Sequence, residues 1–244
     1  MARAGATTKG STLARRETDE LNGSPTRARV VAAATELFRE VGYGGCTVED
    51  IRLRAEVSKA TFYFYFASKD DVFLDVGNAV LARHYESLFG ARWDGPGDPY
   101  SKVVSTNARY LHSLLLNRRI LHDYFSLTFV SPRFREERGK YTKQFQSRIE
   151  RHIERLLDAG EISGLDSKLT AISLSGMVEI VCFRFFSEAE IVGLGSYSIE
   201  SLLCTISKSW YRSLYGKPHP PDFDYEPYIA EVERELGTAA LAIR

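Results

Sequence analysis

The chain has 244 residues, of which 44% are hydrophobic and 26% are charged, and 32 lysines and arginines balance 32 aspartates and glutamates. This composition is typical of a globular protein of one or two domains and excludes wholesale disorder. Zero net charge excludes a protein that coats anionic polymers through bulk charge, although it leaves room for a local basic patch.

The cysteine content and the hydropathy of the sequence indicate the cellular compartment of the protein. The three cysteines, Cys46, Cys182 and Cys204, are odd in number and widely spaced, and they suggest neither a zinc motif nor a disulfide framework. The sequence has no run of eighteen apolar residues, and its N-terminus lacks the apolar segment of a signal peptide. We therefore expect a soluble cytoplasmic protein that uses no membrane, no metal and no cofactor.

The N-terminal third predicts a flexible arm followed by four helices. Residues 1–23 lack hydrophobic periodicity, and their arginines are either part of a disordered tail or contacts to DNA. Ser24 and Pro25 predict the first helix start, and Gly42 its end. Three further starts are predicted from capping patterns, at Thr47 with Asp50, at Ser58, and at Ser68 with Asp71.

The rest of the chain also reads as helices, after a Gly- and Pro-rich linker over 90–99. Apolar periodicity and caps predict helices over 100–116, 118–131, 134–159, 169–186, 198–215 and, weakly, 226–241. No alternating strand pattern is convincing, so the fold class is all-α. These patterns divide the chain into an arm (1–23), a three-helix segment (24–67), a longer helical segment (68–216, with 68–89 as connecting helix) and a tail (217–244).

Residues 47–66 have the layout of a helix-turn-helix. Two short helices meet at a turn of about three residues, and the second opens with a small polar residue, Ser58. In such a motif the second helix enters the major groove of DNA. Residues 52–69 also carry four cations against one anion, which forms a small basic patch. The predicted partner is double-stranded DNA.

The aromatic run from Phe62 to Phe66 fits a helix better than a strand. Phe62 and Phe66 share one face and are expected in the core. Two other faces remain for DNA: one pairs Lys59 with Tyr63, the other Thr61 with Tyr65. Tyrosine hydroxyls can donate to phosphate, and a lysine can reach a phosphate or a guanine edge, although burial of both tyrosines remains the alternative.

Two further residues complete the predicted interface. Phe64 is a costly exposed side chain unless it meets a thymine methyl group or a sugar. Lys69 follows the Ser68 cap, where an ammonium group beside unpaired backbone N–H groups makes a phosphate clamp. A solvated surface charge is the alternative for Lys69.

The segment from Val57 to Lys69, continued by Phe73, resembles the DNA-binding signature of TetR-family transcriptional regulators. Residues 32–42 and 47–55 match the first two helices of that family in order and spacing, so the resemblance covers about residues 26–81. The aromatic run and residues 210–216 are also similar to mycobacterial repressors of ethionamide activation. One departure is Glu56, where glycine is common, so that either a strained left-handed residue or a different turn is expected.

The resemblance implies a three-helix DNA-binding domain and a C-terminal domain that binds a small effector and forms a homodimer through its last two helices. Among the DNA-contact candidates, Lys59 and Tyr65 are assigned to base reading and Thr47, Tyr63 and Lys69 to phosphate. The full set of DNA-contact candidates is Thr47, Lys59, Thr61, Tyr63, Phe64, Tyr65 and Lys69.

The C-terminal domain offers candidates for an interface and for a pocket. Two segments, 169–186 and 199–214, are apolar enough either to pair with a second copy or to form core within one chain. The interface candidates are Leu174, Val178, Val181, Leu202, Ile206 and Trp210. An aromatic-rich set favours a hydrophobic or amphipathic effector, although any single member is more often core. The pocket candidates are Tyr110, Leu114, Phe125, Phe129, Phe145, Met177 and Phe183, with Ile149 and Phe186 beside them.

An enzyme is the weakest interpretation. The sequence has no GxSxG, HExxH, Walker or dinucleotide-binding pattern, and its five histidines lack ligand spacing. A helical adaptor without DNA binding is the other alternative. In the favoured hypothesis, an effector shifts the helix that runs from Lys69 to Tyr85, Leu88 and Phe89 and weakens operator binding.

Overall fold

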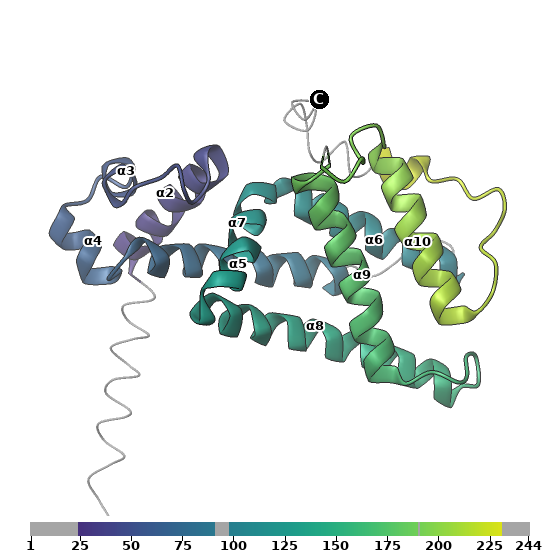
Figure 1. The fold of residues 1–244 in the computed structure, drawn as a ribbon. Helices are drawn as coiled ribbons and strands as arrows, with labels where there is room; N and C mark the ends of the chain where they lie inside the picture. Colours follow the sequence, from purple (N-terminus) through teal and green to yellow (C-terminus); the bar gives the residue numbers. More distant parts are fainter. Residues whose placement is uncertain (1–23, 91–97, 190, 231–244) are drawn as a thin grey trace, which may run out of the picture. The chain divides into compact units, whose positions relative to one another are not determined.

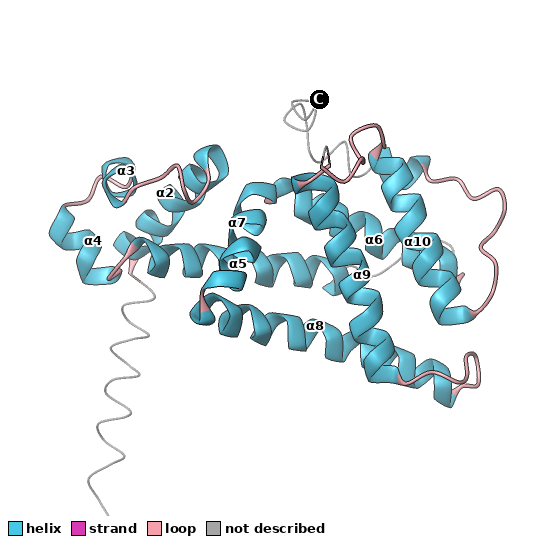
Figure 2. Cartoon of the chain, viewed as in Figure 1, coloured by secondary structure: helices cyan, strands magenta, loops and turns pink. Residues whose placement is uncertain are grey.

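The computed structural model describes residues 24–90, 98–189 and 191–230, and every regular element within these ranges is a helix (Figures 1 and 2). The all-α fold class is therefore confirmed. The helices are α2 (Pro25–Val41), α3 (Val48–Arg54), α4 (Lys59–Tyr65), α5 (Lys69–Gly90), α6 (Pro99–Leu116), α7 (Arg118–Val130), α8 (Pro132–Asp158), α9 (Ser167–Ser187) and α10 (Ile199–Tyr215).

Most predicted helix ends are confirmed by their caps. Ser58, Asp166 and Ser198 each accept a backbone hydrogen bond at the start of their helix, while Gly216 ends α10 in the left-handed region. Pro132 separates α7 from α8, as the predicted ranges 118–131 and 134–159 require, and α8 begins at Pro132 itself, because the first helical position needs no N–H donor. The predicted arm, the middle of the linker and most of the predicted tail helix lie outside the described residues.

The chain divides into two compact units, residues 1–78 and 79–244, and the division falls within α5. Our predicted boundary, before the connecting helix, lies several residues earlier. In the first unit the rings of Phe38 and Phe73 meet edge to face with centroids 4.7 Å apart. Ile51 of α3 and Phe62 of α4 are also fully buried, and α3 packs against both α2 and α4.

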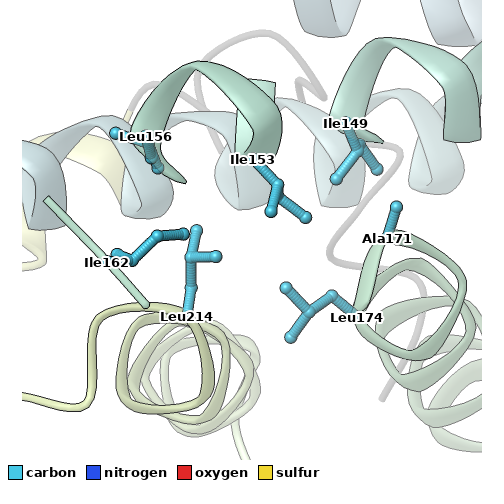
Figure 3. Close-up of a cluster of buried hydrophobic side chains, with 7 residues drawn as sticks. All are labelled: Ile149, Ile153, Leu156, Ile162, Ala171, Leu174 and Leu214. Carbon is cyan, nitrogen blue, oxygen red and sulfur yellow. The ribbon is translucent and has the colours of Figure 1, made fainter. Parts of the chain in front are cut away.

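In the second unit α8 packs against α7 and α9, while α10 packs against α6 and α9. Figure 1 shows α9 running across α8 and alongside α10. One core cluster joins α8, α9 and α10 and is drawn in Figure 3; its buried members are Ile149, Ile153, Leu156, Ile162, Ala171, Leu174 and Leu214. Phe145 and Trp210 pack against this cluster but are only partly buried.

Among the described helices, α9 is long and apolar enough to cross a membrane by length and composition alone. The same is true of many core helices in soluble proteins. Its Glu179 carboxylate pairs with Arg138 of α8, which ties the helix to its neighbour in the unit. Its residues Ala171, Leu174, Val178 and Cys182 are buried, whereas Leu169, Ile172 and Ile180 are exposed.

Candidate nucleic-acid interface and ligand site

The predicted helix-turn-helix is present in α3 and α4. Thr47 and Asp50 form a reciprocal capping box at the start of α3, in which the Asp50 N–H donates to Thr47 Oγ1 over 3.2 Å and the Thr47 N–H donates to Asp50 Oδ2 over 2.8 Å. These hydrogen bonds hold the pKa of the Asp50 carboxyl below its usual value. The start of α4 is capped by Ser58, whose Oγ accepts from the Thr61 N–H over 3.0 Å.

The turn between the two helices is a Schellman motif with Glu56 as its left-handed residue. Glu56 has a φ of 52° and is the only non-glycine residue with a positive φ in the described part of the chain. The Val57 N–H donates to the Arg52 carbonyl and the Glu56 N–H to the Leu53 carbonyl, as this motif requires. The first of our two expectations for Glu56, a strained left-handed residue, is therefore confirmed.

The exposed face of α4 presents aromatic and polar side chains to solvent. Phe62 and Phe66 are buried as predicted, whereas Phe64 is 68% exposed and Tyr63 46% exposed. Lys59 is exposed at the first turn of the same helix. On the second helix of a helix-turn-helix, two exposed aromatic side chains and an exposed lysine can contact a DNA groove.

Two candidates, Tyr65 and Lys69, already make contacts with distant parts of the unit. The Tyr65 hydroxyl lies 2.8 Å from Ser24 Oγ, so base reading would require this hydrogen bond to be exchanged for one to DNA. Lys69 Nζ donates to the carbonyls of Tyr43 and Cys46 over 2.8 and 2.9 Å and lies 4.0 Å from the centroid of the Tyr43 ring. Two of its three N–H donors are thus used in positioning α5, and one is left for a phosphate.

The basic patch of residues 52–69 is weaker than its composition suggests. Arg52 donates to Glu49 over 2.6 Å from Nε, and Arg54 lies 2.6 Å from Glu40. Because both guanidinium groups are paired with carboxylates, their charges are largely compensated locally. Lys59 is the exposed cation of this patch without an ion-pair partner within the described residues.

Sequence comparison matches residues 30–76 to the family "Bacterial regulatory proteins, tetR family", and this range contains the whole of α3 and α4. Residues 30–76 are therefore a DNA-binding domain of the TetR family of transcriptional regulators. The regulator is 22% identical over 195 residues to the HTH-type transcriptional regulator EthR of Mycolicibacterium smegmatis, covering 80% of this chain and 88% of EthR. At this identity the resemblance to one mycobacterial subgroup stays a prediction.

Other similarities concern parts of the chain or the fold alone. The HTH-type transcriptional repressor DhaR of a Mycobacterium species is 45% identical over 65 residues, which cover 27% of this chain and 31% of DhaR. The regulator spans 44% of the length of the Bacillus subtilis relative YuxN, an uncharacterized regulator. A putative fatty acid metabolism regulator from Clostridium perfringens shares the fold, with a TM-score of 0.56 at 24% identity over 79% of this chain and all of that chain.

Among the described residues of the second unit, a small cavity and a groove contain predicted pocket residues. A cavity of about 10 Å³, with room for about one water molecule, lies between α6, α7 and α9 and brings together the predicted pocket residues Tyr110, Leu114, Phe125 and Phe183. A much larger groove of about 1090 Å³ lies between α6, α8 and α10 and contains the predicted residue Phe145. No group of metal-ligating side chains is assembled within the described residues.

Two predicted pocket residues lie elsewhere. Phe129 is 75% exposed at the end of α7, and Met177 is half-buried on α9 without lining either concavity. Both were chosen for their apolar character alone, which does not distinguish a lining position from a surface position.

The predicted interface residues need a larger correction. Leu174, Val178, Leu202 and Ile206 are at most 5% exposed and form core within one chain, while Val181 and Trp210 are partly buried. The exposed apolar side chains of α9 are instead Leu169, Ile172 and Ile180. Because α9 is apolar on several faces, its sequence did not show which face the chain itself covers.

Charged residues beside the groove were not predicted from the sequence. Lys102, Arg148 and Arg155 line it together with apolar side chains. The signal was available, because Arg148 and Arg155 are seven residues apart and therefore lie on one side of α8.

Proposed function

We propose that the regulator is a ligand-responsive repressor that binds a palindromic operator as a homodimer and is released by an amphipathic effector. The observation that carries the DNA-binding part is the exposed face of α4, where Lys59, Tyr63 and Phe64 face solvent on the second helix of a helix-turn-helix. The short but 45% identical match to a named repressor, DhaR, supports repression.

Dimerisation is proposed through the uncovered face of α9. Leu169, Ile172 and Ile180 are 65%, 41% and 48% exposed, although such side chains are usually buried. A second copy on this face would cover them. A two-fold dimer also suits an operator whose half-sites are about 34 Å apart.

Transmission of the effector signal is proposed through α5, which continues from the first unit into the second. In the second unit the Tyr85 ring stacks on Phe145 of α8 with centroids 4.8 Å apart, and the His84 ring meets Tyr110 of α6 at 4.7 Å. A ligand that moves Phe145 or Tyr110 would therefore move α5. The coupling free energy between an effector site and a second binding site, here the one for DNA, is typically 1–3 kcal/mol.

A gel shift with promoter DNA from the gene's own neighbourhood tests operator binding. We expect Tyr63→Phe to weaken binding to specific and non-specific DNA equally, because a lost phosphate contact carries no sequence information. We expect Lys59→Ala also to relax sequence preference, because a base contact is lost. If Lys59→Ala lowers both affinities by the same factor, Lys59 is a phosphate contact and its base-reading role is wrong.

The remaining interpretations have distinct outcomes. An adaptor would bind none of these DNA fragments while retaining its fold. An enzyme would turn over a ligand of the second unit, which mass spectrometry of the incubated ligand would detect. We propose that the regulator acts in the cytoplasm, where its DNA lies, and that it needs no cofactor besides its effector.

A further inference from the structure

The groove between α6, α8 and α10 has an elongated apolar floor. Phe145, Ile149 and Leu156 line it from α8, and Trp210 and Leu214 from α10. Figure 3 shows Ile149, Leu156 and Leu214 converging at the core beneath it. From Phe145 to Leu156 the α8 backbone rises by about 16 Å, so the apolar strip is long and narrow. Its volume of about 1090 Å³ is at the upper end of small-molecule sites.

Cations lie closer to this floor than anions do. Successive α8 residues are rotated by about 100°, which places Arg148 and Arg155 within about 80° of Phe145. Glu154 and Asp158, which also line the groove, are about 140–180° away, on its outer lip. The opposite wall, on α6, adds Lys102. The inner rim on α8 and α6 is therefore positively charged, while Glu161, after the end of α8, also lines the groove.

The electrostatics of His152 support this arrangement. Partial desolvation lowers the pKa of its imidazole, and the charges of Arg155 and Lys102 lower it further, while Glu161 opposes them. Lys102 and Arg155 thus act on the same ring from two different helices. Within the described residues neither of these two cations has an ion-pair partner, so their charge is available to a ligand.

We propose that this groove binds a long-chain aliphatic carboxylate, with its chain on the Phe145–Leu156 strip and its headgroup at Lys102, Arg148 and Arg155. A linear chain suits a narrow strip of about 16 Å, and guanidinium groups match the geometry of a carboxylate. A neutral ligand of the same length would make no ion pair with Lys102 or Arg155.

The groove is linked to α5 by one aromatic contact. Phe145 lines the groove and stacks on Tyr85 of α5, so a bound chain contacts a residue that holds the connecting helix. The regulatory meaning of the groove rests on the proposed function, whereas ligand binding itself does not.

Binding is tested by the fluorescence of Trp210 in a Trp93→Phe background, which leaves Trp210 as the sole tryptophan. Dodecanoate is expected to shift its emission, and shorter carboxylates to bind about two- to fourfold more weakly per methylene removed. Dodecanol and dodecyltrimethylammonium are the neutral and cationic controls, expected to bind at least fivefold more weakly. Equal affinity for dodecanol would overturn the proposal.

Arg148→Gln/Arg155→Gln is expected to weaken dodecanoate binding about five- to tenfold without changing dodecanol binding. Lys143→Gln/Arg212→Gln is the matched control. Lys143 on α8 and Arg212 on α10 are exposed cations on two helices that border the groove, but neither lines it. Circular dichroism confirms the fold of each variant. Unchanged dodecanoate affinity in the groove variant would place the ligand elsewhere. Because this measurement needs no DNA, failure of operator binding leaves its result intact.

Discussion

The backbone conformation of Glu56, in the turn between α3 and α4, was partly predictable from the sequence. Its position in the turn and the usual glycine there predicted either a strained left-handed residue or a different turn, and its φ of 52° agrees with the first. The sequence was informative because a turn of fixed length restricts one residue's backbone geometry. In contrast, it did not reveal that Tyr65 and Lys69 would find partners within the domain, because those contacts join residues 23 to 41 positions apart.

Glu56→Gly is expected to stabilise the protein by about 0.5–1 kcal/mol. Glycine removes the Cβ penalty of the left-handed conformation, and part of that gain is offset by the greater freedom of the unfolded chain. The contact from Arg29 Nη2 is retained, since it goes to the Glu56 carbonyl. Urea unfolding measures the change. Glu56→Ala is the control, because it removes the same carboxylate but keeps Cβ; a gain in Glu56→Ala as large as in Glu56→Gly would show that charge, not strain, is relieved.

His84 makes stability depend on pH. Its ring is 2% exposed between Tyr85 and Tyr110, and burial lowers its pKa to about 4. Between pH 6.5 and 4 the unfolded chain binds a proton that the folded chain does not, so stability falls as pH falls through this window. The loss at pH 4.5 is expected to be about 2–3 kcal/mol.

Urea unfolding at pH 7 and pH 4.5 tests this, with His84→Phe expected to remove most of the difference. His152→Gln is the matched control at a more exposed ring and should change the difference much less. An unchanged pH dependence in His84→Phe would show that carboxylates alone cause the acid sensitivity.

At the scale of elements, caps and periodicity predicted nearly every described helix, because both signals are local. The uncovered face of α9 was not predictable in the same way. Leu174 and Val178 are as apolar as Ile172 and Ile180, and only the packing of α8 and α10 determines which pair is buried. The groove was missed for a related reason, since it needs three helices that are distant in sequence.

Ile172→Glu/Ile180→Glu is expected to convert a dimer into a folded monomer. Two carboxylates on the proposed interface would have to be desolvated without partners, which is costly. Light scattering after size-exclusion chromatography measures the mass. Phe129→Glu is the control, because it also places a carboxylate on an exposed apolar site, at the end of α7. A monomer from Phe129→Glu together with an intact dimer from the α9 variant would move the interface to α7.

At the scale of the whole molecule, cations and anions balance to a net charge of zero, and part of this balance consists of ion pairs within the DNA-binding domain. Arg52 and Arg54 are paired with Glu49 and Glu40, so little of the patch at residues 52–69 acts on DNA as free charge. We therefore expect the correct spacing of α4 in the two copies to contribute more to operator affinity than counterion release does. Composition alone could not distinguish paired from unpaired arginines.

This compensation sets the expected salt dependence of operator binding. If Lys59 and Lys69 each neutralise one phosphate in both copies, the slope of log affinity against log salt is about −4. Lys59→Gln should reduce the magnitude of the slope by about 2, one for each copy. Arg54→Gln should leave it nearly unchanged, because Glu40 already neutralises that guanidinium. Gel shifts over a series of salt concentrations measure these slopes. A larger change for Arg54→Gln than for Lys59→Gln would mean that Arg54 exchanges Glu40 for phosphate when DNA binds.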